Sequence, residues 1–126
     1  MKKILIVIAD YYEDISSSLL KSAKYELNNF SLKVIKVPGV FEIPVTISKN
    51  IKKYDAFIAL GCVIKGETPH FDFISSASTN AIMNLSVENK KPIGNGIITC
   101  LTMKQAKARG KKGKEAAQAV ISVLSQ

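Results

Sequence analysis

Apolar residues are concentrated in four short stretches that are spaced along the whole chain. Stretches of this length, with apolar residues at most positions, are typical of strands buried on both faces of a parallel sheet. The second stretch alternates apolar residues with Lys33 and Lys36, which predicts a more exposed strand. The predicted strands cover Lys3 to Ala9, Ser31 to Val37, residues 54–63 and residues 92–99.

The segments between these strands carry apolar residues at every third or fourth position, which predicts helices. The predicted helices cover residues 15–29, 43–51, 71–87, 103–109 and 114–124, and Gly110 and Gly113 are expected to interrupt the last two. In the longest helix the expected buried stripe consists of Phe71, Ile74, Ala77, Ala81 and Leu85. Strands that alternate with helices in this way favour an α/β fold, with a parallel sheet covered on both faces.

The loops that follow the four predicted strands contain most of the residues suited to chemistry. Tyr11 and Tyr12 follow the first strand, residues 38–42 the second, residues 65–70 the third and residues 99–102 the fourth. Open parallel sheets bind ligands at the carboxyl ends of their strands. We therefore expect the functional site at that edge of the sheet.

The third of these loops offers the strongest chemical signal. Thr68 is predicted to be a helix N-cap and Pro69 the first helical residue, and the start of a helix attracts anions such as phosphate. His70, the only histidine, comes next. Because an imidazole titrates near neutral pH, His70 is a candidate general acid and base.

Other candidates are weaker when taken one at a time. Arg109 could pair with a phosphate through its forked guanidinium group, and Tyr11 could stack on a planar ring. Glu42 could accept hydrogen bonds from sugar hydroxyls. The first loop, residues 10–16, has no glycine, which argues against a dinucleotide fingerprint, a P-loop and a flavodoxin-type flavin phosphate site.

Length and composition favour one cytoplasmic domain over residues 1–126. No apolar run approaches the ~20 residues that span a bilayer. Cys62 and Cys100 without an export signal indicate a reducing compartment, and their spacing predicts no metal site.

The net charge is +8, and six cations lie within residues 104–114. A solvated helical face, a site for a small phosphorylated ligand and a nucleic-acid surface all fit this cluster.

Three segments together resemble the lumazine synthase family. They are VPGVFEIP at residues 37–44, YDAFIALGCVIKGETPHF at residues 54–71, and Gln105-Ala106 followed by Arg109. The resemblance implies a flavodoxin-like three-layer α/β/α sandwich with a four-stranded parallel sheet in the order 2-1-3-4. It also implies that 5-amino-6-(ribitylamino)uracil condenses with 3,4-dihydroxy-2-butanone 4-phosphate to 6,7-dimethyl-8-ribityllumazine. Phosphate and water are released, and no cofactor is required.

The resemblance also implies a role for each matching residue. Tyr11 would stack on the pyrimidine, and His70 would transfer protons. The other implied substrate-binding residues are Val40, Phe41 and Glu42 for the ribityl chain and ring, Cys62, Val63 and Ile64 for the pyrimidine, and Glu67, Thr68 and Arg109 for the phosphate. Lys112 and Asn95 occupy further positions that correspond to the family's site.

The sequence departs from the family pattern at four places. Tyr12 stands where the family usually has asparagine, Asn95 where it usually has phenylalanine, and residues 110–113 form a shorter segment. The family's N-terminal extension is absent from this sequence. We therefore expect a homopentamer that does not close into the family's shell, with riboflavin synthase as a candidate partner and with no membrane or nucleic-acid partner.

Two other functions remain open on the sequence. One is a non-catalytic relative that binds flavin or lumazine, which would account for Asn95 and the short basic segment. The other is a basic α/β module that binds nucleic acid. His70 and Arg109 favour the enzyme over the non-catalytic relative.

Overall fold

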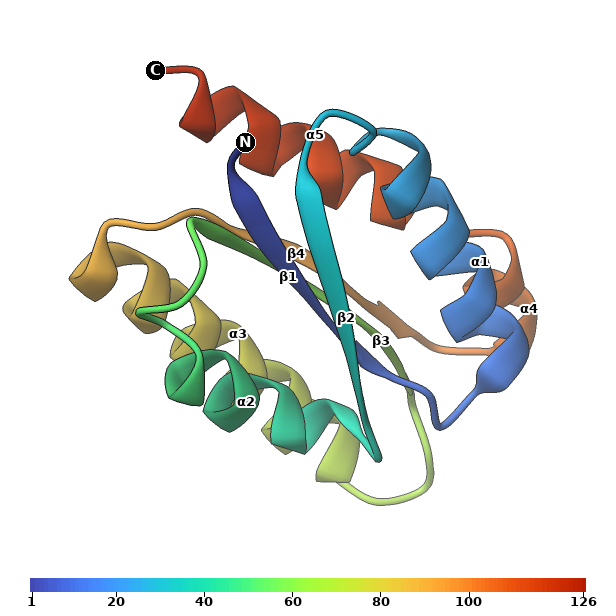
Figure 1. Cartoon of the computed structure of the whole chain (residues 1–126). Helices are drawn as coiled ribbons and strands as arrows, with labels where there is room; N and C mark the ends of the chain where they lie inside the picture. The colour runs from blue at the N-terminus through green and yellow to red at the C-terminus, as the bar shows by residue number, and fades with distance from the viewer.

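The computed structural model describes residues 1–126 as one parallel sheet with helices on both faces (Figure 1). The sheet contains β1 (Lys3–Ala9), β2 (Ser31–Val37), β3 (Ala56–Ile64) and β4 (Ile93–Cys100). All neighbouring strands are parallel, in the order β2-β1-β3-β4. This order confirms the predicted Rossmann-like or flavodoxin-like α/β fold.

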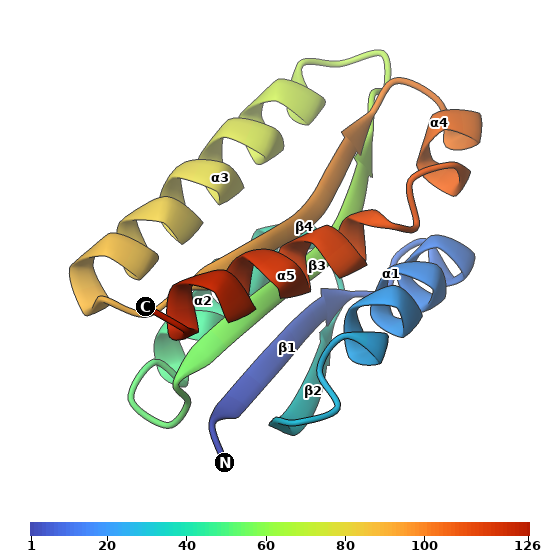
Figure 2. The same cartoon turned by 90° about the horizontal axis from the view of Figure 1, so that it is seen from above.

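The helices lie in two layers, one on each face of the sheet. They are α1 (Glu13–Tyr25), the short 3-10 helix η1 (Val40–Glu42), α2 (Ile43–Lys49), α3 (His70–Asn89), α4 (Met103–Lys107) and α5 (Lys112–Leu124). Figures 1 and 2 show α2 and α3 on one face and α1 and α5 on the other. None of these helices combines the length and hydropathy of a membrane span.

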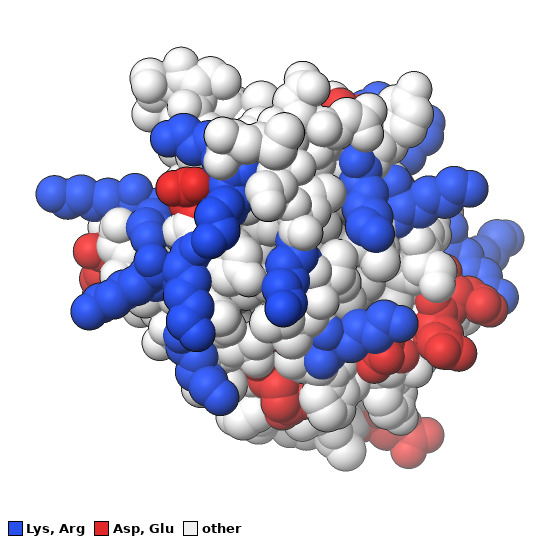
Figure 3. Space-filling model, viewed as in Figure 1, with Lys and Arg blue, Asp and Glu red and all other residues white.

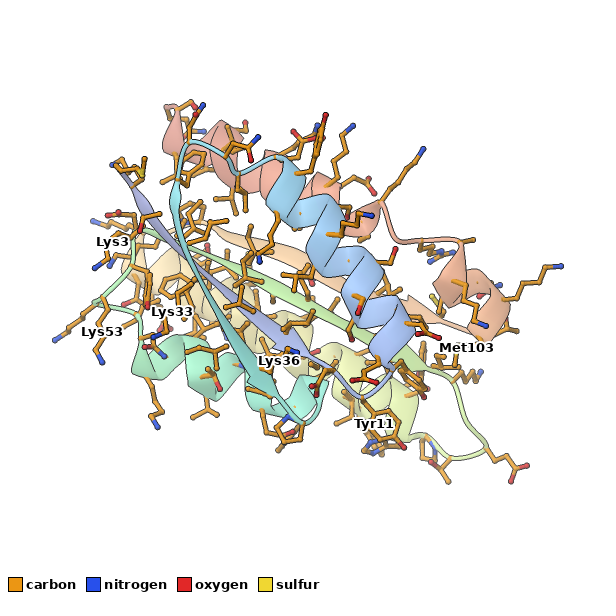
Figure 4. The ribbon with its side chains drawn as sticks, turned by 45° about the vertical axis from the view of Figure 1, so that its right-hand side comes forward. Lys3, Tyr11, Lys33, Lys36, Lys53 and Met103 are labelled. Carbon is orange, nitrogen blue, oxygen red and sulfur yellow. The ribbon has the colours of Figure 1, made fainter.

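β1 is buried on both faces, which explains why its sequence is continuously apolar. Its even-numbered residues from Ile4 to Ile8 belong to the core beneath α1 and α5. Its odd-numbered residues from Leu5 to Ala9 belong to the core beneath α2 and α3. β2 lies at the edge of the sheet, and Lys33 and Lys36 are exposed there as predicted (Figure 4).

Several element ends differ from the prediction by one to four residues. The largest difference is at α1, which ends at Tyr25 and not at residue 29. The apolar spacing continues to Leu27, which is fully buried although it lies beyond the end of α1. Its backbone N–H donates a hydrogen bond to the carbonyl of Lys24. The apolar spacing therefore overestimated the length of this helix.

The predicted helix break at Gly113 is wrong, because this glycine lies in the first turn of α5. A Cβ atom at position 113 would collide with the carbonyl oxygen of Leu19 on α1. The glycine is thus required by close helix packing.

The predicted stripe of α3 is only partly correct. Ile82 and Ser78 are its buried residues, whereas Ala77 is exposed. The large apolar side chains of Phe73, Met83 and Val87 also remain exposed. This helix covers the sheet with a narrow face and leaves apolar surface uncovered.

Close packing of α5 on β4 generates a test of the fold. A Cβ atom at Gly94 of β4 would collide with the backbone oxygen of Ala116, and it would lie 2.9 Å from Cγ2 of Val120. Because backbone cannot rotate away, we expect Gly94→Ala to lower the free energy of unfolding by about 1–3 kcal/mol, the usual cost of overpacking. Urea unfolding at matched protein concentration measures the difference.

Gly66→Ala is the matched control, because nothing lies within 4 Å of the position a Cβ would take there. We expect its free energy of unfolding to stay within about 0.5 kcal/mol of the unsubstituted protein. Equal stability of the two variants would show that α5 does not lie this close to β4.

Candidate functional site

A cavity of about 590 Å³ lies at the carboxyl ends of the strands, where the sequence predicted the site. Residues from the loops after β1 and β2, from the end of β3 and from the start of α3 contribute to it. Its lining consists of Tyr11, Tyr12, Gly39, Val40, Phe41, Glu42, Cys62, Val63, Ile64, His70 and Ile74. We call this the His70 cavity. It brings together residues from two of the three segments that suggested the family.

The absence of a side chain at Gly61 in β3 allows one wall of the His70 cavity to form. A Cβ atom there would lie 2.9 Å from Cγ2 of Val40 and 3.2 Å from the Cβ of Ala9. The η1 segment can therefore pack directly on the sheet, with Val40 buried. Phe41, next to it, remains 67% exposed, so the cavity has an apolar rim open to solvent.

Two tyrosines form the opposite part of the rim. Tyr11 is 76% exposed at the end of β1 (Figure 4), and its ring meets Tyr12 edge to face, with 4.9 Å between the ring centroids. Burial is the main cause that raises the pKa of Tyr12, and negative charge on nearby Cys62 would raise it further.

Tyr12 lines the cavity although the sequence indicated only Tyr11 as the ring-stacking residue. It is half-buried and packs against the core beneath α1. Ile8 and Ile15, which lie four residues before Tyr12 and three residues after it, belong to the same core. This apolar spacing could have identified Tyr12. Gly39, within the predicted loop of residues 38–42, also lines the cavity, as does Ile74, which was missed.

The start of α3 differs by one residue from the prediction. Pro69 is the N-cap and His70 the first helical residue, whereas the sequence suggested Thr68 as the cap. The Thr68 hydroxyl still accepts a hydrogen bond from the backbone N–H of His70, at 3.4 Å. His70 is exposed and lines the cavity, whereas Glu67 and Thr68 lie in the exposed loop beside it.

Arg109, Lys112 and Asn95 line a second hollow, also of about 590 Å³, beside the edge strand β4. Ile97, Ile98, Thr99, Ala108, Lys111 and Glu115 complete this Arg109 hollow. The Asn95 side-chain oxygen accepts a hydrogen bond from the N–H of Ile97, at 3.0 Å. One chain therefore does not bring the predicted phosphate partner Arg109 into the same cavity as His70.

A pair of hydrogen bonds similar to a capping box sets the start of the segment that leads to Arg109. The Gln105 backbone N–H donates to the Thr102 hydroxyl at 3.2 Å. In return, the Gln105 side-chain oxygen accepts from the N–H of Leu101 at 2.8 Å. Such reciprocal bonds satisfy backbone donors at a helix start. They hold α4 close to the end of β4, and Arg109 follows two residues after α4.

The basic residues around Arg109 are not all equivalent. Lys114 forms an ion pair with Glu26, with 3.8 Å between the charged atoms. Lys104, Lys107 and Lys111 are exposed. Figure 3 shows Lys and Arg side chains spread widely over the visible face, with acidic groups among them. This distribution resembles a solvated surface more than a single nucleic-acid groove.

Comparison with protein families shows which family the chain belongs to. The family model for 6,7-dimethyl-8-ribityllumazine synthase matches residues 1–126. The chain belongs to the lumazine synthase family.

Curated relatives in the lumazine synthase family cover nearly the whole chain. 6,7-dimethyl-8-ribityllumazine synthase 1 of Rhodopseudomonas palustris is 46% identical over 97% of this chain and 83% of its own. 6,7-dimethyl-8-ribityllumazine synthase of Methylorubrum extorquens strain PA1 is 43% identical over 98% of this chain and 79% of its own.

A solved structure of rubredoxin oxygen:oxidoreductase from Desulfovibrio gigas covers 100% of this chain and 38% of its own, at 11% identity and a TM-score of 0.49.

Cys62 is the one cysteine that lines the His70 cavity. It is only 8% exposed, and burial, with a smaller contribution from Cys100, raises the pKa of its thiol from 9.0 to about 11. A thiol attacks as the thiolate, so at neutral pH this group is a poor nucleophile. The site therefore favours chemistry without a cysteine-bound intermediate.

The raised pKa predicts how Cys62 titrates. We expect the thiolate absorbance of Cys62, isolated as the difference between the unsubstituted protein and Cys62→Ser, to appear near pH 11 in the folded protein and near pH 9 after unfolding. The thiol of Cys62 loses its proton at a lower pH in the unfolded chain than in the folded protein. The contribution of Cys62 to the free energy of unfolding is therefore complete below pH 9 and is lost as pH rises through 11. Thiolate formation near pH 7 in the folded protein would contradict the burial argument.

Proposed function

We propose that this protein is an active lumazine synthase and that residues 1–126 form its single catalytic domain. The reaction is the condensation of 5-amino-6-(ribitylamino)uracil with 3,4-dihydroxy-2-butanone 4-phosphate. The observation that carries the proposal is the His70 cavity, where an exposed aromatic ring, a carboxylate and the only imidazole converge in a member of this family.

Each substrate group has a matching partner in the chain. Tyr11 stacks on the pyrimidine, and residues 40–42 and 62–64 hold its ring and ribityl chain. Glu67, Thr68, Arg109 and Lys112 surround the phosphate, and Asn95 forms the wall beside it. The substrate amine attacks the ketone and loses water to give an imine, phosphate is then eliminated, and the ring closes with loss of a second water. His70 accepts and returns the protons, and placing both substrates together supplies much of the rate.

A complete site in this proposal requires two copies of the chain. Support comes from the separation of the His70 cavity and the Arg109 hollow within one chain, and from the uncovered apolar residues of α3. Arg109 of one copy then enters the His70 cavity of its neighbour. We propose a homopentamer, for which light scattering should give about five times 13.7 kDa, roughly 69 kDa.

The deciding experiment mixes both substrates with the purified protein and follows the absorbance of 6,7-dimethyl-8-ribityllumazine. The same mixture without protein provides the spontaneous rate to subtract. Rate enhancement supports the enzyme. Tight binding of lumazine without rate enhancement would instead identify a non-catalytic relative.

His70→Ala tests the proton-transfer role. We expect the enzymatic rate to fall by about 10²–10⁴-fold, the usual contribution of general acid and base catalysis, with the lower end favoured by the spontaneous reaction. Because His70 is exposed at the first turn of α3, the fold and pyrimidine affinity should change little. Wild-type turnover across neutral pH would remove His70 from the mechanism.

Arg109→Ala tests recognition of the phosphate. We expect use of the butanone phosphate to weaken by about 1.5–3 kcal/mol, the range for a hydrogen bond to a charged group. Pyrimidine binding should be nearly unchanged. Lys107→Ala is the matched control, because Lys107 is exposed and lines neither hollow. An equal loss for both substrates would make Arg109 structural.

Mixing the two variants tests whether the residues come from different copies. His70→Ala and Arg109→Ala chains are unfolded together and refolded at equal amounts. If each site combines His70 of one copy with Arg109 of the next, about a quarter of the sites in random rings regain both residues. No recovery of activity would place both residues in the same chain's site.

A further inference from the structure

The Ser22 hydroxyl connects α1 to the segment that follows Arg109. It donates a hydrogen bond to the carbonyl oxygen of Gly110 at 2.7 Å, a shorter contact than the 3.1 Å to the carbonyl oxygen of Leu19 in its own helix. It also accepts one from the backbone N–H of Lys114 at 3.1 Å. These two contacts join residues that are 88 and 92 positions apart in the sequence. One side chain thus holds both ends of residues 110–114.

Residues 110–114 include Lys111 and Lys112 of the Arg109 hollow, and Arg109 lies directly before them. The backbone N–H of Lys112 donates to the Arg109 carbonyl at 3.0 Å. Gly113 packs so closely that a Cβ there would lie 2.6 Å from the Ser22 hydroxyl oxygen. Displacement of this segment would therefore move the backbone of Arg109 and Lys112 together.

Packing of α1 on α5 does not itself depend on the Ser22 hydroxyl. Leu19 and Ala23 of α1 are buried in the same core as Ala116, Ala117 and Val120 of α5. Those contacts fix the helices to each other but include none of residues 108–111, which connect α4 to α5. Gly110 packs against Ser18 of α1, and the Ser22 hydroxyl adds the hydrogen bonds that hold this connection.

We propose that Ser22 is a positioning residue for phosphate binding, acting through the backbone of residues 109–112. This inference rests on the proposed function, because it assigns Ser22 to the same site. Ser22 lines neither the His70 cavity nor the Arg109 hollow, so its effect on the substrate is indirect. Its loss should affect one substrate and spare the other.

Steady-state kinetics of Ser22→Ala, after subtraction of the spontaneous rate, test this role. We expect the KM for the butanone phosphate to rise roughly three- to tenfold, the equivalent of one lost hydrogen bond. The kcat and the KM for the pyrimidine should stay within about twofold, because the His70 cavity is untouched. Hydrogen exchange should rise in the peptide containing residues 109–114 and remain unchanged in α3.

Two variants separate positioning from general stability. Ser22→Thr keeps the hydroxyl and should restore the KM, because a hollow of about 440 Å³ beside Ser22 has room for the added methyl group. Ser17→Ala removes an exposed hydroxyl from the same helix and should match the unsubstituted enzyme. Melting temperatures of all variants show whether a kinetic change follows a loss of folding.

The possible results distinguish this inference from the proposed function. If the unsubstituted protein turns over and Ser22→Ala behaves like Ser17→Ala, the Ser22 inference alone is overturned. Equal increases in the KM of both substrates, or failure of Ser22→Thr to restore the KM, overturn it as well. If the unsubstituted protein does not turn over the substrates, the proposed function and the Ser22 role both fall.

Discussion

Burial of β1 on both faces is the constraint on which the rest of the structure depends. A strand with apolar residues on both sides needs helices above and below it, so each neighbouring strand must be reached by a crossover. The crossovers make the strands parallel and bring the loops after all four strands to one edge of the sheet. The His70 cavity lies at that edge because Ile4 to Ala9 cannot be exposed to water on either side.

Sequence patterns predicted this architecture well, because the order of elements and the burial of strands depend on local apolar spacing. They were less reliable where tertiary contact decides the outcome. Leu27 is buried in a turn, and Gly113 is a glycine because α1 lies against it. Neither fact can be derived from the residues next to it in the chain. For the same reason the stripe of α3 was only partly predicted.

The candidate site shows the same limit. Residues that follow β1, β2 and β3 meet in the His70 cavity, as strand order predicts. Arg109 was expected near them, since it follows β4 at the same edge, but its side chain lines the hollow on the outer side of that strand. Whether a residue at a sheet edge faces its own chain or another one depends on packing that a single sequence does not specify. Tyr12 was placed at this edge but given no role, because its burial depends on the core beneath α1.

The position of α5 across β3 and β4 also sets an order of events during synthesis. The core beneath α1 and α5 combines residues such as Ile4 and Leu19 with Ala117 and Val120, which the ribosome adds about a hundred residues later. Until α5 emerges, α1 alone can cover that face of β1 and β3, whereas α2 and α3 can already cover the other face. A nascent chain therefore carries a partly exposed apolar sheet face until translation is nearly finished, and this is the period in which it would benefit most from a chaperone.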